Sequence, residues 1–194
     1  MSQTVAFGSV PTELGAVLVA VTELGVAGTS FQDTPDDRDR AVTELGVTGT
    51  GFQDALDARY QMAARLGLPV VVDPARTEAA EAELAGYFAG TLHRFTLPLD
   101  WQSTSTARRT VLSTLHSTVP YGEVITYGEL AERSGTGIPP RGIGAIMGSN
   151  HIPIIVPCHR VVAGSHLGGF SAPGGVHSKR HLLTLEGHLP PTLW

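Results

Sequence analysis

The stretch Thr126 to Met147, TYGELAERSGTGIPPRGIGAIM, decides the fold of the second half of this chain. Thr126 belongs to the residue types that cap helices, and the apolar residues Leu130 and Ala131 follow it. The glycines and prolines of SGTGIPP end this helix, and Arg141 begins a second one. The pattern predicts two short helices joined by a turn, the arrangement of a helix-turn-helix. A helical hairpin of this kind can also be a simple packing unit.

The second of these helices is rich in small residues: Gly142, Gly144, Ala145 and Gly148. Glycine weakens a helix, so such a sequence is a poor choice for filling a core. It favours the close approach of something flat or bulky.

Outward from this segment, Ile152 to Val162 reads IPIIVPCHRVV and holds the only cysteine, Cys158. Next to His159, this thiol is either a nucleophile or a small buried hydrophobe. If residues 154–162 are extended, neighbouring side chains point to opposite faces, so Cys158 and His159 would exchange a proton only through a water. Arg160 is interpreted as an ion-pair partner or loop brace.

Composition narrows the class of protein. The 194 residues are 42% hydrophobic, which is enough for a globular core, and a single cysteine leaves a thiolate zinc site without partners. No metal or cofactor is expected. No apolar run approaches a membrane span and the N-terminus does not look like a signal peptide, so we expect a cytoplasmic protein without membrane contact.

Charge is distributed unevenly. Residues 1–100 hold 6 basic and 14 acidic residues, a net charge of −8, whereas residues 101–194 hold 7 and 4, a net charge of +3. The second half is therefore compatible with a modest, salt-sensitive affinity for DNA.

The first half contains a duplication. Ala20 to Asp33, AVTELGVAGTSFQD, matches Ala41 to Asp54, AVTELGVTGTGFQD, at 12 of 14 positions. Each copy predicts a hairpin around a Thr-Glu-Leu-Gly turn. Only the first copy follows a full apolar strand, so we expect the second to be an extra hairpin or edge segment.

The remaining pattern predicts an α+β protein with a boundary near residue 100, giving domains 1–100 and 101–194. We expect helices at 55–66, 77–89, 106–117, 127–133, 140–147 and from about 176 to 187, and short strands at 69–73 and 94–97.

Five ordered blocks between Val119 and Gly187 carry a family resemblance: VPYGEVITYGELA, PPRGIGAIMGSN, PIIVPCHRVV, LGGFS and KRHLLTLEG. The segment resembles the methylated-DNA–protein-cysteine methyltransferases, the O6-alkylguanine-DNA alkyltransferases. The first half resembles them more loosely, through GAVLVAVTELGVAGTSFQD. The resemblance implies an N-terminal α/β domain with a small antiparallel sheet. It also implies a mainly helical, winged-helix-like C-terminal domain that binds DNA and accepts the alkyl group.

The resemblance also implies an activity and roles for residues. The alkyl group of O6-alkylguanine, and also of O4-methylthymine, would move once per molecule to Cys158. His159 would be the base through a bridging water, Glu186 would orient His159, Asn150 would brace the cysteine loop, and Tyr127 would donate a proton to the departing guanine. The partner would be double-stranded DNA bound through its minor groove with the base flipped out, and the protein a monomer.

Further positions follow from the same resemblance. Arg141 would enter the base stack, and Gly142 and Ala145 would face DNA beside it. Arg108 and Arg109 are candidate phosphate contacts or a solvated basic face. The guanine-pocket positions are Pro153, Val161, Val162 and Ser171. The chain departs from the family at His151, where proline is common, and at Ala172-Pro173, which extends a glycine-rich segment.

Three other functions remain open at this point. Alkyltransferase-like proteins recognise the damaged base without an acceptor cysteine, which the presence of Cys158 argues against. A cysteine hydrolase would need a remote His/Asn pair, and none stands out in the sequence. A DNA-binding regulator would use the helical hairpin and would not need the thiol.

Overall fold

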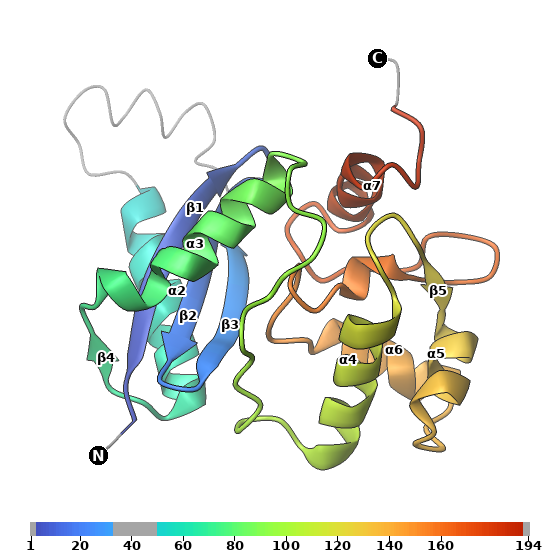
Figure 1. Cartoon of the computed structure of the whole chain (residues 1–194), viewed down its shortest axis with the longest axis horizontal. Helices are drawn as coiled ribbons and strands as arrows, with labels where there is room; N and C mark the ends of the chain where they lie inside the picture. The colour runs from blue at the N-terminus through green and yellow to red at the C-terminus, as the bar shows by residue number, and fades with distance from the viewer. Residues whose placement is uncertain (1–2, 33–49, 192–194) are drawn as a thin grey trace. The chain divides into compact units, whose positions relative to one another are not determined.

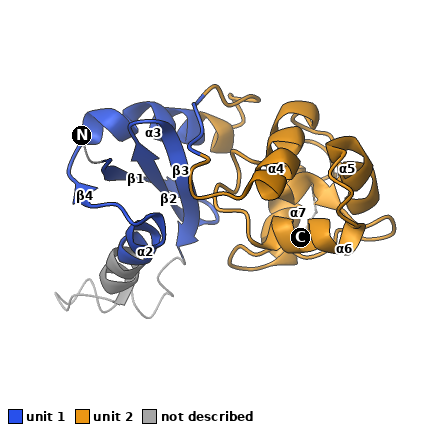
Figure 2. Cartoon of the chain, turned by 90° about the horizontal axis from the view of Figure 1, so that it is seen from below, with its two compact units in different colours: residues 1–85, 97–100 blue, residues 86–96, 101–194 orange. Residues whose placement is uncertain are grey.

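The computed structural model describes residues 3–32 and 50–191, and the chain forms two compact units (Figure 2). Unit 1 consists of Met1–Ala85 and Leu97–Asp100, and unit 2 of Gly86–Thr96 and Trp101–Trp194. Residues 86–96, which precede the expected boundary near residue 100, thus group with unit 2. The predicted α+β class is confirmed. None of the helices in the described ranges is long and apolar enough to cross a bilayer.

Unit 1 is built on a four-stranded sheet in the order β3-β2-β1-β4 (Figure 1). Strands β1 (Val5–Thr12), β2 (Gly15–Thr22) and β3 (Gly25–Gln32) are antiparallel, as expected. The short edge strand β4 (Val70–Val71) lies in the expected segment 69–73 but runs parallel to β1.

Helices cover both faces of this sheet (Figure 1). Met62 and Ala63 of α2 (Thr50–Leu66) pack on β-strand residues that include Leu18. On the opposite face, Gly8 lies against Glu81 of α3 (Pro74–Phe88), where any Cβ would overlap the Glu81 side chain. Because it is covered on both sides, the central strand β2 is almost wholly buried.

The two hairpins of the sheet use the same four-residue turn, Thr-Glu-Leu-Gly, at residues 12–15 and 22–25. In both, the leucine N–H donates to the threonine Oγ1, at 3.1 Å and 3.2 Å. The following glycines, Gly15 and Gly25, have φ of 98° and 131°, a region that glycine occupies without strain. The hairpin predicted for the first copy of the duplication is therefore confirmed.

The second copy behaves differently. Its residues 41–49 lie outside the described residues, but α2 begins at Thr50, so the end of the copy is helical where the matching residues 29–32 belong to β3. The expected hairpin or edge segment is wrong for this part. The physical reason is the continuation of the chain, because DALDARYQMAARL is rich in helix formers and places Ala58, Met62 and Leu66 on one face against the sheet.

The strand expected at 94–97 is also absent from this described part of the chain. A single bridge joins Val26 to Leu99 instead, with hydrogen bonds of 2.8 Å from Val26 N–H to the Pro98 carbonyl and from Asp100 N–H to the Val26 carbonyl. Pro98 has no N–H to continue a ladder, which limits pairing to one residue.

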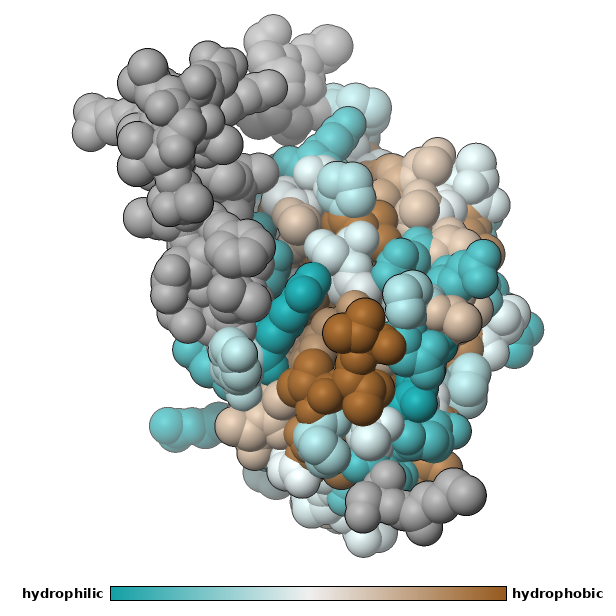
Figure 3. Space-filling model, turned by 90° about the vertical axis from the view of Figure 1, so that its left-hand side faces the viewer, coloured by the Kyte–Doolittle hydropathy of each residue, from teal (hydrophilic) through white to brown (hydrophobic). Residues whose placement is uncertain are grey.

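Figure 3 shows the β4 end of unit 1, where apolar side chains gather on the surface. Val70 in β4 is 49% exposed and Val72 just after it is 95% exposed. The strand is only two residues long, which keeps this edge a poor template for pairing with another chain.

Unit 2 is mainly helical, with four helices close to their predicted ranges: α4 (Thr106–Thr118), α5 (Tyr127–Ser134), α6 (Pro140–Gly148) and α7 (Val176–Leu185). Leu115, Leu130, Ile143 and Leu182, one from each helix, are fully buried. A two-stranded parallel sheet joins β5 (Ile125–Thr126) to β6 (Val161–Val162).

Local signals explain the boundaries of α5 and α6. Thr126 and Glu129 form a reciprocal capping box at the start of α5, and Gly135, with φ of 62°, ends it. Pro140 occupies the first turn of α6, where its missing N–H costs nothing. The two helices therefore meet around the short connection 135–139, as the sequence pattern predicts.

Candidate functional site

The cysteine loop is not extended. Residues Cys158–Arg160 form a single 3-10 turn between the prolines of the loop and β6, and Ile154 has φ of 73°. The condition of an extended chain over residues 154–162 is therefore met only at its end, in β6. Local hydrogen bonds hold the bend before it, because the Asn150 amide Nδ2 donates to the Val156 carbonyl at 2.9 Å while its Oδ1 accepts from Ile152 N–H at 3.1 Å.

Cys158 is 4% exposed and lies in the wall of a pocket of about 380 Å³. The lining residues come from α5, α6, the cysteine turn and the glycine-rich loop: Tyr127, Gly144, Met147, Gly148, Cys158, Gly169, Phe170 and Ser171. The small residues of α6 thus leave room beside the thiol. A Cβ at Gly148 would meet no atom within 4 Å, whereas one at Gly144 would meet the Tyr127 ring at 3.9 Å.

The electrostatic environment keeps the thiol protonated. Burial raises the pKa of Cys158 above its ordinary value, and the Asn150 side chain and the positive charge of Lys179 oppose this rise. A raised pKa means that the thiol needs a base before it can act as a nucleophile.

His159 lies next to it in the chain and is fully buried. Its Nε2 is 2.8 Å from Oε1 of Glu186, and since an ionised carboxylate only accepts, Nε2 is assigned as the N–H. Burial lowers the pKa of the imidazole, although Glu186 opposes this. The other nitrogen, Nδ1, is buried without a hydrogen-bond partner among the described residues, so a neutral His159 offers there a free lone pair.

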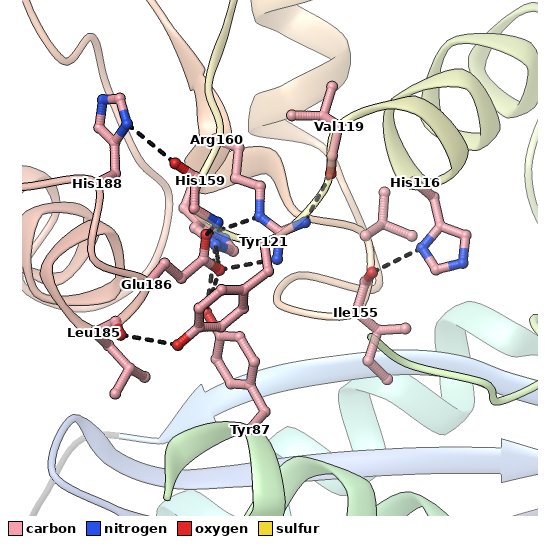
Figure 4. A network of polar contacts seen from close by, with 12 residues as sticks. Tyr87, His116, Val119, Tyr121, Ile155, His159, Arg160, Leu185, Glu186 and His188 are labelled. Atoms are coloured by element: carbon pink, nitrogen blue, oxygen red, sulfur yellow. Dashed lines mark hydrogen bonds and ion pairs between the residues drawn. The ribbon is translucent and has the colours of Figure 1, made fainter. Parts of the chain in front are cut away.

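The Glu186 carboxylate is the centre of a polar network (Figure 4). Oε1 accepts from His159, from the Tyr87 hydroxyl at 2.7 Å and from Arg160 at 2.9 Å. Oε2 accepts from Arg160 Nε at 2.9 Å and from Gly122 N–H at 3.3 Å. Burial favours the neutral acid, but the hydrogen bonds from His159 and Arg160 hold the pKa of the Glu186 carboxyl at about 2.

Arg160 forms the ion pair that the sequence led us to expect and braces the structure as well. Its guanidinium binds both oxygens of Glu186 and donates to the Val119 carbonyl at 2.8 Å. Glu186 caps the C-terminal end of α7, where the helix dipole disfavours a negative charge. The pairing with Arg160 offsets this.

Lys179 is a site residue that sequence reasoning missed. It is fully buried in α7, and its ammonium donates to the Val161 carbonyl at 2.6 Å and to the Gly169 carbonyl at 3.2 Å. Burial lowers the pKa of Lys179 to about 8. The lysine thus ties β6 to the glycine-rich loop and adds positive charge near Cys158.

Tyr127 begins α5 and is half-buried in the pocket wall. A Cβ at Gly168 would lie 3.1 Å from its hydroxyl oxygen, so the glycine-rich loop passes directly beside this group. Burial, together with the negative charge of an ionised Cys158, raises the pKa of Tyr127. The hydroxyl therefore stays protonated and can donate.

The expected DNA-facing residues lie on two helices. Arg141 and Ala145 are exposed on α6, while Gly142 is half-buried and would place a Cβ 2.6 Å from Ile138 Cγ2. Gly142 therefore serves the tight connection into the helix. On α4, Arg109 is exposed and Arg108 half-buried, and none of the three arginines has an ion pair with another described residue.

Only one of the four residues expected to line the guanine pocket lies in the wall of the pocket beside Cys158. Ser171 lines the pocket beside Cys158, whereas Pro153, Val161 and Val162 are not among its lining residues. Val161 is fully buried in β6, and Val162 lines a different cavity with His166 and Arg180. Met147, Gly148 and Phe170 line the Cys158 pocket without having been singled out for it. Within the described ranges, no three His, Cys, Asp or Glu side chains are grouped to hold a metal ion.

Comparison with known proteins places this geometry in a family. Residues 106–188 match the family model for the DNA-binding domain of 6-O-methylguanine DNA methyltransferase. The chain is 42% identical over 120 residues to the methylated-DNA–protein-cysteine methyltransferase of Mycobacterium tuberculosis, covering 61% of this chain and 70% of that protein. It is 51% identical over 72 residues to the protein of the same name from Methanopyrus kandleri, covering 37% and 52% of the two chains.

Solved structures agree over nearly the whole length. The crystal structure of Mycobacterium tuberculosis O6-methylguanine methyltransferase superposes with a TM-score of 0.66 at 27% identity, covering 98% of this chain and 97% of that one. A structure of Mycobacterium tuberculosis OGT in complex with DNA gives a TM-score of 0.67 at 28% identity, covering 94% and 93%. The chain belongs to the methylated-DNA–protein-cysteine methyltransferase family.

Proposed function

We propose that this protein repairs DNA by moving the alkyl group of O6-alkylguanine onto Cys158, once per molecule. Family membership makes it a DNA-repair alkyltransferase with DNA as its partner. The observation that carries the assignment of the acceptor is the position of the only cysteine in the chain in the wall of a pocket lined by glycines. The alternative of a non-catalytic recognition or regulatory module leaves this thiol and its polar network without a purpose.

The residues around Cys158 supply both an acceptor for the thiol proton and a donor for the departing guanine. The thiol gives its proton to Nδ1 of His159 through one bridging water, and the sulfur attacks the alkyl carbon as its bond to the guanine oxygen breaks. Tyr127 donates a proton to the departing guanine. The proton that His159 has taken from the thiol then replaces the proton that Tyr127 has lost. The product is a thioether, which has no easy leaving group, so each molecule acts once.

The DNA-facing side of the proposal uses residues 101–194 as the DNA-binding and acceptor domain. The pair α5 and α6 acts as the helix-turn-helix, with α6 in the minor groove and Arg141 in the stack that the flipped nucleotide vacates. Arg108 and Arg109 contact phosphates, and the protein works as a monomer. Arg109 on α4 and Arg141 on α6 support this assignment, since both are exposed and neither forms an ion pair with another described residue.

The pocket assignment follows the same logic. Ser171, Met147 and Phe170 hold the extruded guanine, and O4-methylthymine is accepted as a smaller substrate. For Pro153, Val161 and Val162, contact with the base stays a prediction that a complex with DNA would test.

The direct test is an intact-mass measurement after incubation with an oligonucleotide that contains O6-methylguanine. We expect a gain of one methyl group, about 14 Da, on Cys158, and none in Cys158→Ser. Lesion removal by Cys158→Ser would contradict the proposal. Arg141→Ala should lose more activity on duplex DNA than on the free base, and equal losses would rule out its place in the stack.

A further inference from the structure

We infer that Tyr87 is a positioning residue for the His159–Glu186 pair. Its hydroxyl holds the carboxylate oxygen that receives His159 Nε2–H, and so keeps the bare nitrogen of the imidazole available to Cys158. The inference rests on the proposed role of His159 as the base.

The geometry places the hydroxyl at the junction of the pair (Figure 4). Tyr87 is fully buried in the last turn of α3, within the part of that helix that belongs to unit 2. Its oxygen is 2.7 Å from Glu186 Oε1 and 3.4 Å from His159 Nε2, while Nε2 is 2.8 Å from the same Oε1. The Tyr87 hydroxyl and His159 Nε2–H thus converge on the same carboxylate oxygen, which also accepts from Arg160.

The ring of Tyr87 is held by aromatic neighbours. Phe88, Phe95 and Tyr121 surround it with ring centroids at 5.2, 5.4 and 6.1 Å, and the Phe88 and Tyr121 contacts are edge-to-face. Aromatic packing of this kind leaves a side chain little rotational freedom. The hydroxyl therefore has a defined direction, which is what a group that orients a catalytic partner requires.

The hydroxyl is confined to the role of donor. Burial and the negative charge of Glu186 raise the pKa of Tyr87 well above its ordinary value, so the proton stays on the oxygen. Nε2 is itself a donor, so the carboxylate is the acceptor that the Tyr87 proton can reach.

The shared oxygen has a consequence for the basicity of His159. The ionisable groups that act on this imidazole among the described residues include Glu186, Arg160, Lys179 and Tyr87, and Cys158 precedes it in the chain. Glu186 is the acidic residue whose charge stabilises an imidazolium, and Tyr87 takes up part of the charge on Oε1. Removing the hydroxyl leaves more of this charge for His159, which favours the protonated ring.

The test is Tyr87→Phe, which keeps the ring and deletes the hydroxyl. The pKa of His159 is followed by NMR in full-length protein with ¹⁵N-labelled histidine, its signal being the one missing from His159→Gln. We expect the pKa of His159 to rise by about half a pH unit or more, because hydrogen bonds to charged groups are among the strong ones. The acidic limb of the rate of methyl transfer should move to higher pH by the same amount.

Tyr121→Phe is the matched control. Its hydroxyl donates to the Leu185 carbonyl at 2.8 Å, so this variant loses a hydrogen bond in the same aromatic cluster without touching the carboxylate. We expect no shift in the pKa of His159.

An unchanged pKa in Tyr87→Phe, or an equal shift in both variants, would overturn the inference. A shifted pKa with an unshifted rate profile would instead overturn the base role of His159 and leave the Tyr87 contact in place. The two failures are therefore distinguishable.

Discussion

The two units bury their polar side chains in different ways. In unit 1 the buried polar residues of the described chain are Thr22, Thr29, Thr77 and Asp100, and in unit 2 they are Ser134, His159, Arg160, Ser178, Lys179 and Glu186. Unit 1 thus buries three threonines and one carboxylate in addition to its apolar core. Unit 2 buries His159, Arg160, Lys179 and Glu186 as well as the Cys158 thiol.

The two units therefore differ in what stabilises their interiors: apolar packing in unit 1, and paired polar and charged groups in unit 2. Apolar packing needs only volume and shape, whereas a buried charge is tolerated only with partners that satisfy it. The buried charges of unit 2 therefore depend on one another, as the pairing of Glu186 with Arg160 shows.

The largest effect should come from breaking that dependence. Glu186→Gln leaves the Arg160 guanidinium buried without its counter-charge, and we expect a loss of about 3–5 kcal/mol in the free energy of unfolding. Denaturant titration measures it. The double variant Glu186→Leu with Arg160→Met should recover much of the stability without recovering methyl transfer. A loss below about 1 kcal/mol in the single variant would mean that the pair is not desolvated as the structure has it.

Packing in unit 1 gives the next effect. Leu18 of β2 is fully buried against α2, so Leu18→Ala should cost about 2–5 kcal/mol through the cavity it leaves. Methyl transfer per folded molecule should stay at the wild-type rate, because Leu18 belongs to the apolar core of unit 1 whereas Cys158 belongs to unit 2. A lower rate in fully folded protein would contradict this expectation.

The free energy of unfolding should also respond to acid differently through the buried Glu186 of unit 2 and the exposed Glu23 of unit 1. The pKa of Glu186 in the folded protein is about 2, below its ordinary value of 4.5, so its contribution is present above about pH 4.5 and is lost as the pH falls toward 2. We expect a loss of up to about 3 kcal/mol in this window, absent in Glu186→Gln. The matched control is the exposed Glu23 of unit 1, whose pKa is also about 2. Its replacement by glutamine should leave most of the acid response unchanged.

The smallest effect concerns a single buried hydroxyl group in unit 1. Thr22 Oγ1 donates to Asp100 Oδ2 at 2.7 Å and also accepts from Leu24 N–H in the hairpin turn. Thr22→Val keeps the shape, removes both bonds and should cost about 1–3 kcal/mol. Thermal unfolding measures the change, and a neutral result would show that water replaces the hydroxyl.

The duplicated segment shows where sequence reasoning reaches its limit. The Thr-Glu-Leu-Gly turn of the first copy was predictable, because its glycine and threonine satisfy the turn locally. The end of the second copy is helical despite its near identity to β3, because α2 is stabilised by packing on the sheet. The apolar pattern of the cysteine loop likewise does not specify its bend, which Asn150 holds through side-chain hydrogen bonds to the Ile152 and Val156 backbone.

The sequence by itself determined the helices of unit 2, the single cysteine and the family, because caps, breakers and ordered motifs are local features. Only the tertiary structure decided what surrounds the thiol. Glu186 meets Arg160 across 26 residues and Tyr87 across 99, and Lys179 reaches β6 across 18. Such contacts follow from how the last turn of α3, the cysteine turn and α7 pack together. The periodicity of the sequence cannot specify these contacts, because the pattern around each residue does not indicate which distant side chain it will meet.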